Sequence, residues 1–434
     1  MTNRPRVFAR TVATVPAGVL WQAACFALLL MAIPLQGQEL PAGYRAEVPV
    51  TAPTRLDYVF PLANQSPATT PAGWLKEYDS KKQNYEQFVP DSYDPKRTWP
   101  LVLFVSAGNR STGFRAWQEV CQQQGILFAG PHQAGNATDM RQRVRIVLDV
   151  LDDMRRKFRI DPDRTYISGF SGGGRIACQL GFSLPELFGG VVPLCAAGEL
   201  REESWLRHRA IDRLSVALVT GENDFNRGEV ERFRGPLLRD LGVRTRIDVQ
   251  PGLGHGMPSA GVLTEVYQWL EAGAKSRREL AEQYPASRAD SKDVAGRQQA
   301  AAALLREARS RLEQQDTLYS GLMQLQGVMV RWNDLPEAKQ ARTILLEYDA
   351  DPNAAWREDD VAEQRQHLVA RARALDAYAS GPLPETYQKQ RPAMLKAAIA
   401  LRQQVLADGQ DDRAVREADV RLPALRKELA AAAE

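Results

Sequence analysis

The chain has 434 residues, of which 44% are hydrophobic and 25% are charged, and its formal net charge is +3. This length exceeds one ordinary domain and predicts two, with the composition of a globular protein. The small net charge, with no six-residue run of one sign, gives no electrostatic basis for nucleic acid as a partner.

Residues 1–37 are predicted to be a secretory signal peptide. Three arginines stand within the first ten residues, and residues 19–33 form an apolar segment of 15 residues. This length suits a signal peptide and is short for a membrane span. We therefore expect a secreted or periplasmic protein, cleaved near Gly37 and without a stable membrane span afterwards. The alternative is an uncleaved N-terminal membrane anchor.

Residues 38–84 are interpreted as an N-terminal extension, and residues 85–275 as an α/β domain. Short β-branched segments alternate there with amphipathic helical segments, such as the one over 144–158. This alternation predicts a doubly wound, mostly parallel sheet with helices on both faces and ligands at the carboxyl ends of the strands. The predicted strands are 101–105, 126–129, 164–168, 191–195, 215–220 and 246–249.

Residues 169–173 read Gly-Phe-Ser-Gly-Gly, a G-x-S-x-G sequence between a predicted strand and a predicted helix. This context is typical of a nucleophile elbow, in which a serine stands on a sharp strand-to-helix turn. The strained turn requires neighbours nearly free of side chains, which Gly169 and Gly173 satisfy. We predict Ser171 as a nucleophile and the backbone N–H of Gly172 as a donor to a developing oxyanion.

A candidate acid and a candidate base follow Ser171 at the ends of later predicted strands. A serine hydroxyl needs an adjacent base, and His255 lies in a glycine-flanked loop after the last predicted strand. Histidine accepts and returns a proton near neutral pH. Asp224 follows the preceding strand and is predicted to orient this base, with Glu222 as the alternative acid. The order Ser–acid–His is that of α/β-hydrolases.

The other three histidines are not predicted to act in catalysis. His132 ends another predicted strand and is interpreted as a solvent-facing loop residue, with a place in the pocket wall as the alternative. His208 and His367 fall in polar helical segments and are interpreted as surface residues.

Three cysteines remain once the signal segment is removed, and their spacing matches no zinc motif. Cys121, Cys178 and Cys195 are therefore interpreted as buried thiols. A disulfide between Cys178 and Cys195 is the alternative in an exported protein. No metal or organic cofactor is implied.

Residues 290–434 are predicted to form an all-α C-terminal domain. Only 5 of the 31 glycines lie beyond residue 274, and the region is rich in alanine, glutamine, arginine and glutamate with helical periodicity. A packed bundle is the preferred interpretation and a loose array of helical pairs the alternative. The region is also a candidate protein-binding surface. A polar boundary is placed at about 275–295.

Residues from about 85 to 272 resemble the α/β-hydrolase superfamily, in particular secreted polyhydroxybutyrate depolymerases and feruloyl or acetylxylan esterases. The resemblance is carried by residues 85–90, 93–95 and 99–103 before the elbow, 161–164 directly ahead of it, and 187–193 after it. It implies Ser171 as nucleophile, Asp224 as acid and His255 as base. It covers less than half of the chain.

The sequence departs from these esterases after the strand that ends at Val105. They usually carry a His-Gly pair there, followed by the residue that donates the second oxyanion N–H, whereas this chain has Ser106, Ala107 and Gly108. A backbone donor survives a change of side chain, so Gly108 is the predicted second donor and Ala107 the alternative.

The sequence thus predicts a secreted serine hydrolase that cleaves carboxylic esters, small or polymer-linked, through an acyl-enzyme intermediate. One alternative is a serine peptidase of the prolyl-oligopeptidase type. The other is a catalytically weakened hydrolase fold that serves as a binding or interaction protein.

Overall fold

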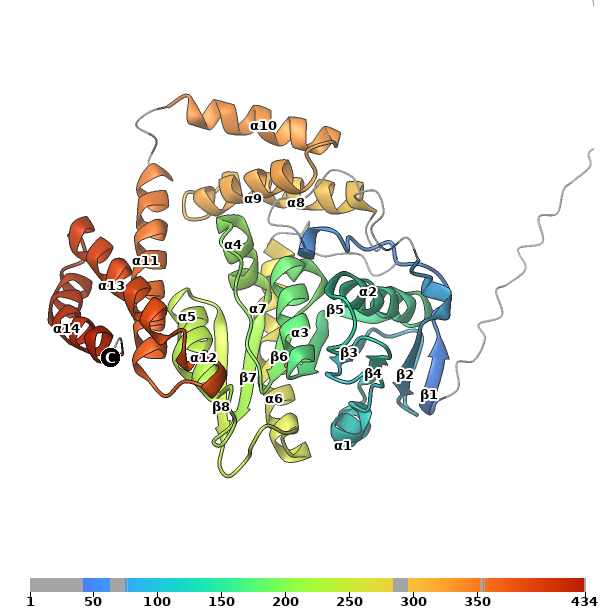
Figure 1. The fold of residues 1–434 in the computed structure, drawn as a ribbon. Coiled ribbons are helices and arrows are strands. Elements are labelled where there is room, and N and C mark those ends of the chain that lie inside the picture. The colour runs from blue at the N-terminus through green and yellow to red at the C-terminus, as the bar shows by residue number, and fades with distance from the viewer. Residues whose placement is uncertain are drawn as a thin grey trace, which may run out of the picture. The chain divides into compact units, whose positions relative to one another are not determined.

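Figure 1 shows the computed structural model, which describes residues 42–62, 75, 77–283, 296–351, 354 and 356–432. The predicted signal peptide lies outside these residues, as do parts of the predicted N-terminal extension and the segment 284–295. Ala42–Glu434 forms one compact unit. The domain boundaries placed at 275 and 290 stay predictions.

The described residues form an eight-stranded mixed sheet in the order β1-β2-β4-β3-β5-β6-β7-β8. β2 pairs antiparallel with β1 and β4, and every other neighbouring pair is parallel. This mostly parallel sheet with connecting helices confirms the predicted α/β-hydrolase fold class. The strands are β1 (Gly43–Pro49), β2 (Asn84–Val89), β3 (Trp99–Val105), β4 (Leu127–Pro131), β5 (Ile160–Phe170), β6 (Gly190–Leu194), β7 (Ser215–Gly221) and β8 (Arg244–Gln250).

Helices cover both faces of the sheet, which is why β3, β4, β6 and β7 are buried along their whole length. On one face Trp117 of α1 and Leu263 of α6 share a core with Phe104 and Val192 of the sheet. On the other face α3 approaches β6 so closely that a Cβ on Gly181 would lie 2.3 Å from Val191. The helices between the strands are α1 (Phe114–Gln124), α2 (Met140–Lys157), α3 (Gly172–Ser183), α4 (Ser204–Arg213) and α5 (Gly235–Asp240), with short η1 (Phe60–Leu62), η2 (Ser80–Lys82), η3 (Pro185–Leu187) and the π-helical η4 (Glu229–Arg234). After β8 follow α6 (Ala260–Ala272) and α7 (Ala274–Gln283).

The described part of the predicted N-terminal extension belongs to the sheet and its helices. β1 adds an antiparallel edge strand, with Gly43 opposite Val89 of β2. After β1, the backbone N–H of Thr51 donates to Asp153 of α2 at 2.9 Å, and that of Thr54 to Asp149 at 2.7 Å. These bonds satisfy carboxylates that are fully buried on α2.

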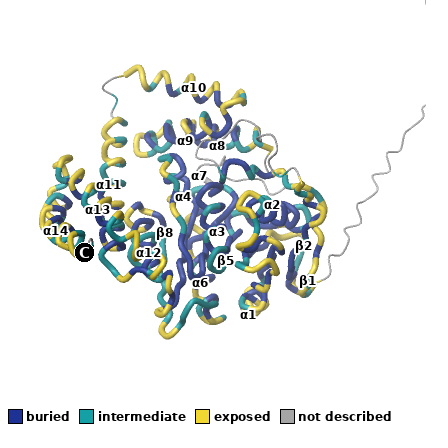
Figure 2. The backbone as a smooth tube through the Cα atoms, in the orientation of Figure 1, coloured by how far each residue is buried: buried dark blue, intermediate teal, exposed yellow. Residues whose placement is uncertain are grey.

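The C-terminal region is helical, as predicted, and Figure 2 shows both buried and exposed residues along most of its helices. α8 and α9 pack together with α10, and α11 packs with α13 and α14 around small buried cores. α9 also packs on α4, and α11 on η4 and α5. The helices are α8 (Arg297–Leu312), α9 (Leu318–Arg331), α10 (Pro336–Asp349), α11 (Trp356–Ser380), α12 (Glu385–Gln388), α13 (Arg391–Asp408) and α14 (Asp412–Ala431).

A buried ionic cluster joins α4 to α8. Glu307 is fully buried and accepts hydrogen bonds from Arg209 Nη1 on both carboxylate oxygens, at 2.5 and 2.6 Å. Arg311 Nη2 lies 3.2 Å and Gln324 Nε2 2.9 Å from the same carboxylate. Burial opposes ionisation of Glu307, but the charges of Arg209 and Arg311 outweigh it and hold its pKa below the ordinary value.

A second ionic contact joins α4 to α11. Glu363 lies 2.7 Å from Arg207 Nη2 and 3.6 Å from His208 Nε2, and it accepts a hydrogen bond from the Tyr319 hydroxyl at 2.8 Å. Burial opposes its ionisation, but His208 and Arg207 lower its pKa from 4.5 to about 2. Both ionic contacts tie the helical region to the α4 side of the sheet.

Candidate active site

Ser171 occupies the turn between β5 and α3 with a strained backbone, at φ 53° and ψ −121°. The turn is tight because the neighbouring glycines allow backbone segments to touch. A Cβ on Gly169 would lie 2.5 Å from the carbonyl carbon of Gly173, and one on Gly173 would lie 2.0 Å from the carbonyl oxygen of Val105. Any larger residue at either position would force the turn apart, so the glycines hold the serine at the carboxyl edge of the sheet.

The structure brings Ser171, His255 and Asp224 together in one hydrogen-bonded chain. His255 Nε2 lies 3.0 Å from Ser171 Oγ, and His255 Nδ1 lies 2.8 Å from Asp224 Oδ1. The Asp224 side chain is fully buried and that of His255 is 22% exposed. When Nδ1 donates to the carboxylate, Nε2 of the neutral ring is left to accept the serine proton.

Asp224 is held by two further donors. Thr220 Oγ1 donates to Asp224 Oδ2 at 2.6 Å, and the backbone N–H of Asn226 donates to Oδ1 at 3.0 Å. The alternative acid, Glu222, is exposed and accepts instead from the backbone N–H of Gly252 at 2.9 Å. The geometry therefore selects Asp224 as the partner of the imidazole.

Two aromatic rings flank the imidazole of His255. The ring centroid of Phe225 lies 4.1 Å from that of His255, and the centroid of Phe170 lies 5.0 Å away. Phe225 is 58% exposed, which is unusual for so large an apolar side chain. The sequence analysis missed Phe225, although its position directly after Asp224 was a signal that could have found it.

The predicted oxyanion donors lie on two neighbouring segments. Gly172 is the first residue of α3, where the backbone N–H has no partner within the helix. The N–H of Gly108 donates to Ser106 Oγ at 3.2 Å. The loop after β4 contacts the loop of Gly108, because the backbone N–H of Asn136 donates to the carbonyl of Ala107 at 2.8 Å. The roles of Gly172 and Gly108 as donors stay predictions.

Cys195 lies close to Asp224 and His255, and its raised pKa keeps it a neutral thiol at physiological pH. Its Sγ donates to the carbonyl of Gly256 at 3.2 Å. Burial, together with the charge of Asp224, raises the pKa of Cys195 to about 12. The Sγ of Cys195 and ligand atoms of Asp224 and His255 lie within 4.8 Å of one another, the spacing of a possible metal site. In this structure Asp224 and His255 bind each other.

The three cysteines of the described region are buried and unpaired, as the preferred interpretation of Cys121, Cys178 and Cys195 predicts. The alternative disulfide between Cys178 and Cys195 is absent from this structure. The interpretation of His132 as solvent-facing is wrong. Its ring is buried and accepts a hydrogen bond from the backbone N–H of Ser111 at 3.0 Å, because the loop after β3 folds over it.

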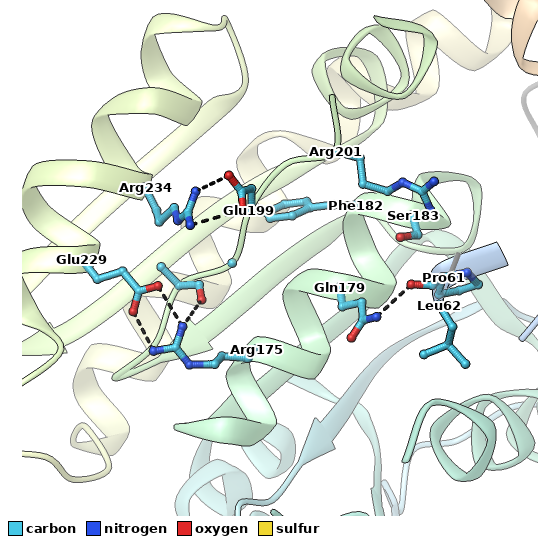
Figure 3. A pocket seen from close by; sticks show the side chains of 12 residues that line it. Pro61, Leu62, Arg175, Gln179, Phe182, Ser183, Glu199, Arg201, Glu229 and Arg234 are labelled. Atoms are coloured by element: carbon cyan, nitrogen blue, oxygen red, sulfur yellow. Dashed lines mark hydrogen bonds and ion pairs between the residues drawn. The ribbon is translucent and has the colours of Figure 1, made fainter. Parts of the chain in front are cut away.

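A pocket of about 400 Å³ lies along α3, lined in part by its residues from Arg175 to Ser183. In Figure 3 the Arg175 side chain points to Glu229, and Arg234 points to Glu199. Arg175 binds both carboxylate oxygens of Glu229, at 2.8 and 2.7 Å. The triad residues do not line this pocket, and ion pairs neutralise much of its charge.

No helix among the described residues is long and apolar enough to cross a membrane.

No family model matches the chain, and no curated protein matches it. Among solved structures, a thermostable esterase is similar at 24% identity and a TM-score of 0.35, over 46% of this chain and 59% of that protein. Est1E from Butyrivibrio proteoclasticus is similar at 13% identity and a TM-score of 0.35, over 46% of this chain and 97% of that one.

The thermophilic esterase Est2 from Thermogutta terrifontis is similar at 17% identity and a TM-score of 0.33, over 47% of this chain and 92% of that one. The aligned part of this chain spans less than two thirds of the thermostable esterase.

Proposed function

We propose that this protein is a secreted serine hydrolase that cleaves carboxylic esters. The observation that carries the proposal is the chain of hydrogen bonds from Ser171 through His255 to Asp224, with Ser171 held on a strained turn. A strained serine within 3.0 Å of an imidazole nitrogen, whose other nitrogen binds a buried carboxylate, is the arrangement needed to activate a hydroxyl.

The reaction would proceed through an acyl-enzyme. Ser171 Oγ attacks the ester carbonyl carbon while His255 Nε2 takes the hydroxyl proton, and the carbonyl electron pair moves onto oxygen. The backbone N–H groups of Gly172 and Gly108 are proposed to donate hydrogen bonds to that oxyanion. The C–O bond to the alcohol then breaks, and His255 returns its proton to the leaving alkoxide.

Water completes the cycle by the same steps in reverse. His255 removes a proton from water, the hydroxide adds to the acyl carbon, and collapse of the second tetrahedral intermediate releases the acid and restores Ser171. Asp224 keeps the imidazole oriented and stabilises its charged form throughout. The fully buried carboxylate suits this role because its three hydrogen bonds leave it little freedom to turn.

Both small and polymer-linked esters are proposed as substrates. The exposed ring of Phe225 beside His255 is consistent with an open site that accepts a bulky ester. Export to the periplasm or the cell exterior is proposed from the basic and apolar N-terminal segment.

Labelling with a fluorophosphonate probe and hydrolysis of short p-nitrophenyl esters test the proposal. Wild-type protein and a Ser92→Ala control, which changes an exposed serine far from Ser171 in sequence, are expected to label and to hydrolyse. Ser171→Ala is expected to do neither. Labelling that survives in Ser171→Ala, or folded wild-type protein without ester turnover, would contradict the proposal. Turnover of p-nitroanilide peptides in place of esters would favour the peptidase alternative.

A further inference from the structure

The side chain of Asn136 lies directly against the residue that follows the proposed nucleophile. A Cβ on Gly172 would lie 2.0 Å from Asn136 Oδ1, 2.7 Å from Cγ and 2.9 Å from Nδ2. The amide therefore occupies the space that a side chain at residue 172 would need. The approach is possible only because residue 172 has no side chain, so Gly172 and Asn136 are matched to each other.

Asn136 is also fixed to the loop that carries the predicted second oxyanion donor. Its backbone N–H donates to the carbonyl of Ala107 at 2.8 Å. The preceding residue packs as closely, since a Cβ on Gly135 would lie 2.5 Å from the carbonyl carbon of Gly108. Asn136 thus touches both the loop after β3 and the first turn of α3, the two segments that carry the predicted oxyanion donors.

The backbone N–H of Gly108 and the side-chain amide of Asn136 differ in whether they already make a hydrogen bond. The N–H of Gly108 already donates to Ser106 Oγ at 3.2 Å, so an oxyanion would have to displace that bond. The Asn136 side chain is exposed and makes no hydrogen bond to any described residue. An unengaged amide N–H next to Gly172 is a donor that requires no bond to be broken first.

We propose that the Nδ2–H of Asn136 donates to the oxyanion together with the backbone N–H of Gly172. This inference rests on the proposed function of Ser171 as an acyl-transfer nucleophile. It would also offset the departure at residues 106–108, where this chain lacks the His-Gly pair of the esterases that its sequence resembles. Asn136 is then a catalytic residue that acts on the transition state more than on bound substrate.

The test compares wild type with Asn136→Ala and Asn136→Asp on a short p-nitrophenyl ester. Asn223→Ala is the matched control, because Asn223 is an exposed loop asparagine at the same edge of the sheet whose side chain makes no hydrogen bond to a described residue. Loss of one oxyanion donor is expected to lower kcat by roughly 10²-fold or more in both Asn136 variants, with KM changed by less than about threefold. Asn223→Ala is expected to keep the wild-type kcat.

A boronic acid that adds to Ser171 gives a readout that a purely structural role would not move. Its affinity is expected to fall by roughly the same factor as kcat/KM in Asn136→Ala, while the melting temperature stays close to that of Asn223→Ala. A kcat for Asn136→Ala within about threefold of wild type would overturn the inference and leave the proposed function standing. Folded wild-type protein without Ser171-dependent turnover would overturn both.

Discussion

Replacing Glu307 with alanine is expected to lower the free energy of unfolding by about 3–5 kcal/mol, because it removes the shared acceptor of a buried ionic cluster. Glu307 is fully buried, and Arg209 and Arg311 have side chains only 5% and 4% exposed. Without the carboxylate, Arg209 loses both of its short contacts, at 2.5 and 2.6 Å, and keeps its charge in a site that water barely reaches. This loss is a large share of the roughly 5–15 kcal/mol that stabilises a typical domain.

Urea unfolding followed by tryptophan fluorescence measures this loss, since Trp205 and Trp332 are buried on α4 and at the end of α9. The midpoint is expected to fall while the slope stays constant. Glu347→Ala, an exposed change on α10, is expected to stay within about 0.5 kcal/mol of wild type.

A double variant distinguishes the loss of stability caused by an unpaired buried charge from the loss caused by poorer packing. Glu307→Leu combined with Arg209→Met removes the charges of Glu307 and Arg209, leaves Arg311 paired with Asp212, and is expected to recover much of the stability lost in Glu307→Ala. A loss below about 1 kcal/mol in Glu307→Ala would refute the reasoning. So would two separate transitions in wild-type protein, because the helical region would then unfold independently of the sheet.

Three further predictions concern the triad, the elbow and the pH dependence of stability. Asp224→Asn is expected to lower kcat for ester hydrolysis by roughly 10⁴-fold while the exposed Glu222→Gln stays near wild type, and the opposite ranking would reject Asp224 as the orienting acid. Gly173→Ala is expected to lower the melting temperature and abolish fluorophosphonate labelling, since its Cβ would meet a β3 carbonyl at 2.0 Å, whereas Gly261→Ala, with nothing closer than 3.8 Å, serves as the tolerated control. Equal melting temperatures for the two glycine variants would contradict this account of the turn. The pKa of Glu363 is lowered to about 2, so its contribution to stability is present above its ordinary value of 4.5 and is lost as the pH falls toward 2. The difference in unfolding free energy between wild type and Glu363→Gln should therefore shrink between about pH 5 and about pH 2, and a difference independent of pH would contradict the assignment.

Much of the sheet could be predicted because its strands are buried on both faces. Residues 101–105 and 215–220 are nearly continuous apolar segments, and they became β3 and β7 with boundaries only a residue or two different. β1 escaped prediction because it is an edge strand in which only Val48 is buried. Its place in the sheet depends on pairing with β2, about 40 residues further along the chain.

The other wrong or missing predictions also concern contacts between residues that are far apart in the sequence. His132 looked solvent-facing at the end of a strand, but the loop after β3 covers it and donates the N–H of Ser111 to its ring. Asn136 carries no local signal, since it matters only through a neighbour distant in sequence.

The sequence by itself determined the type of chemistry to expect. The turn at Ser171 is a local structure that glycines permit, and the order Ser171, Asp224, His255 follows from the alternation of strands and helices, which places loop residues at one edge of a parallel sheet. Only the tertiary structure decided which acid binds the imidazole. Asp224 and Glu222 both carry a carboxylate, but Asp224 is buried and hydrogen-bonded to His255, whereas Glu222 is exposed and accepts from Gly252. It also decided that the amide of Asn136 lies against Gly172, because that contact depends on how two separate loops pack and no local sequence pattern encodes such packing.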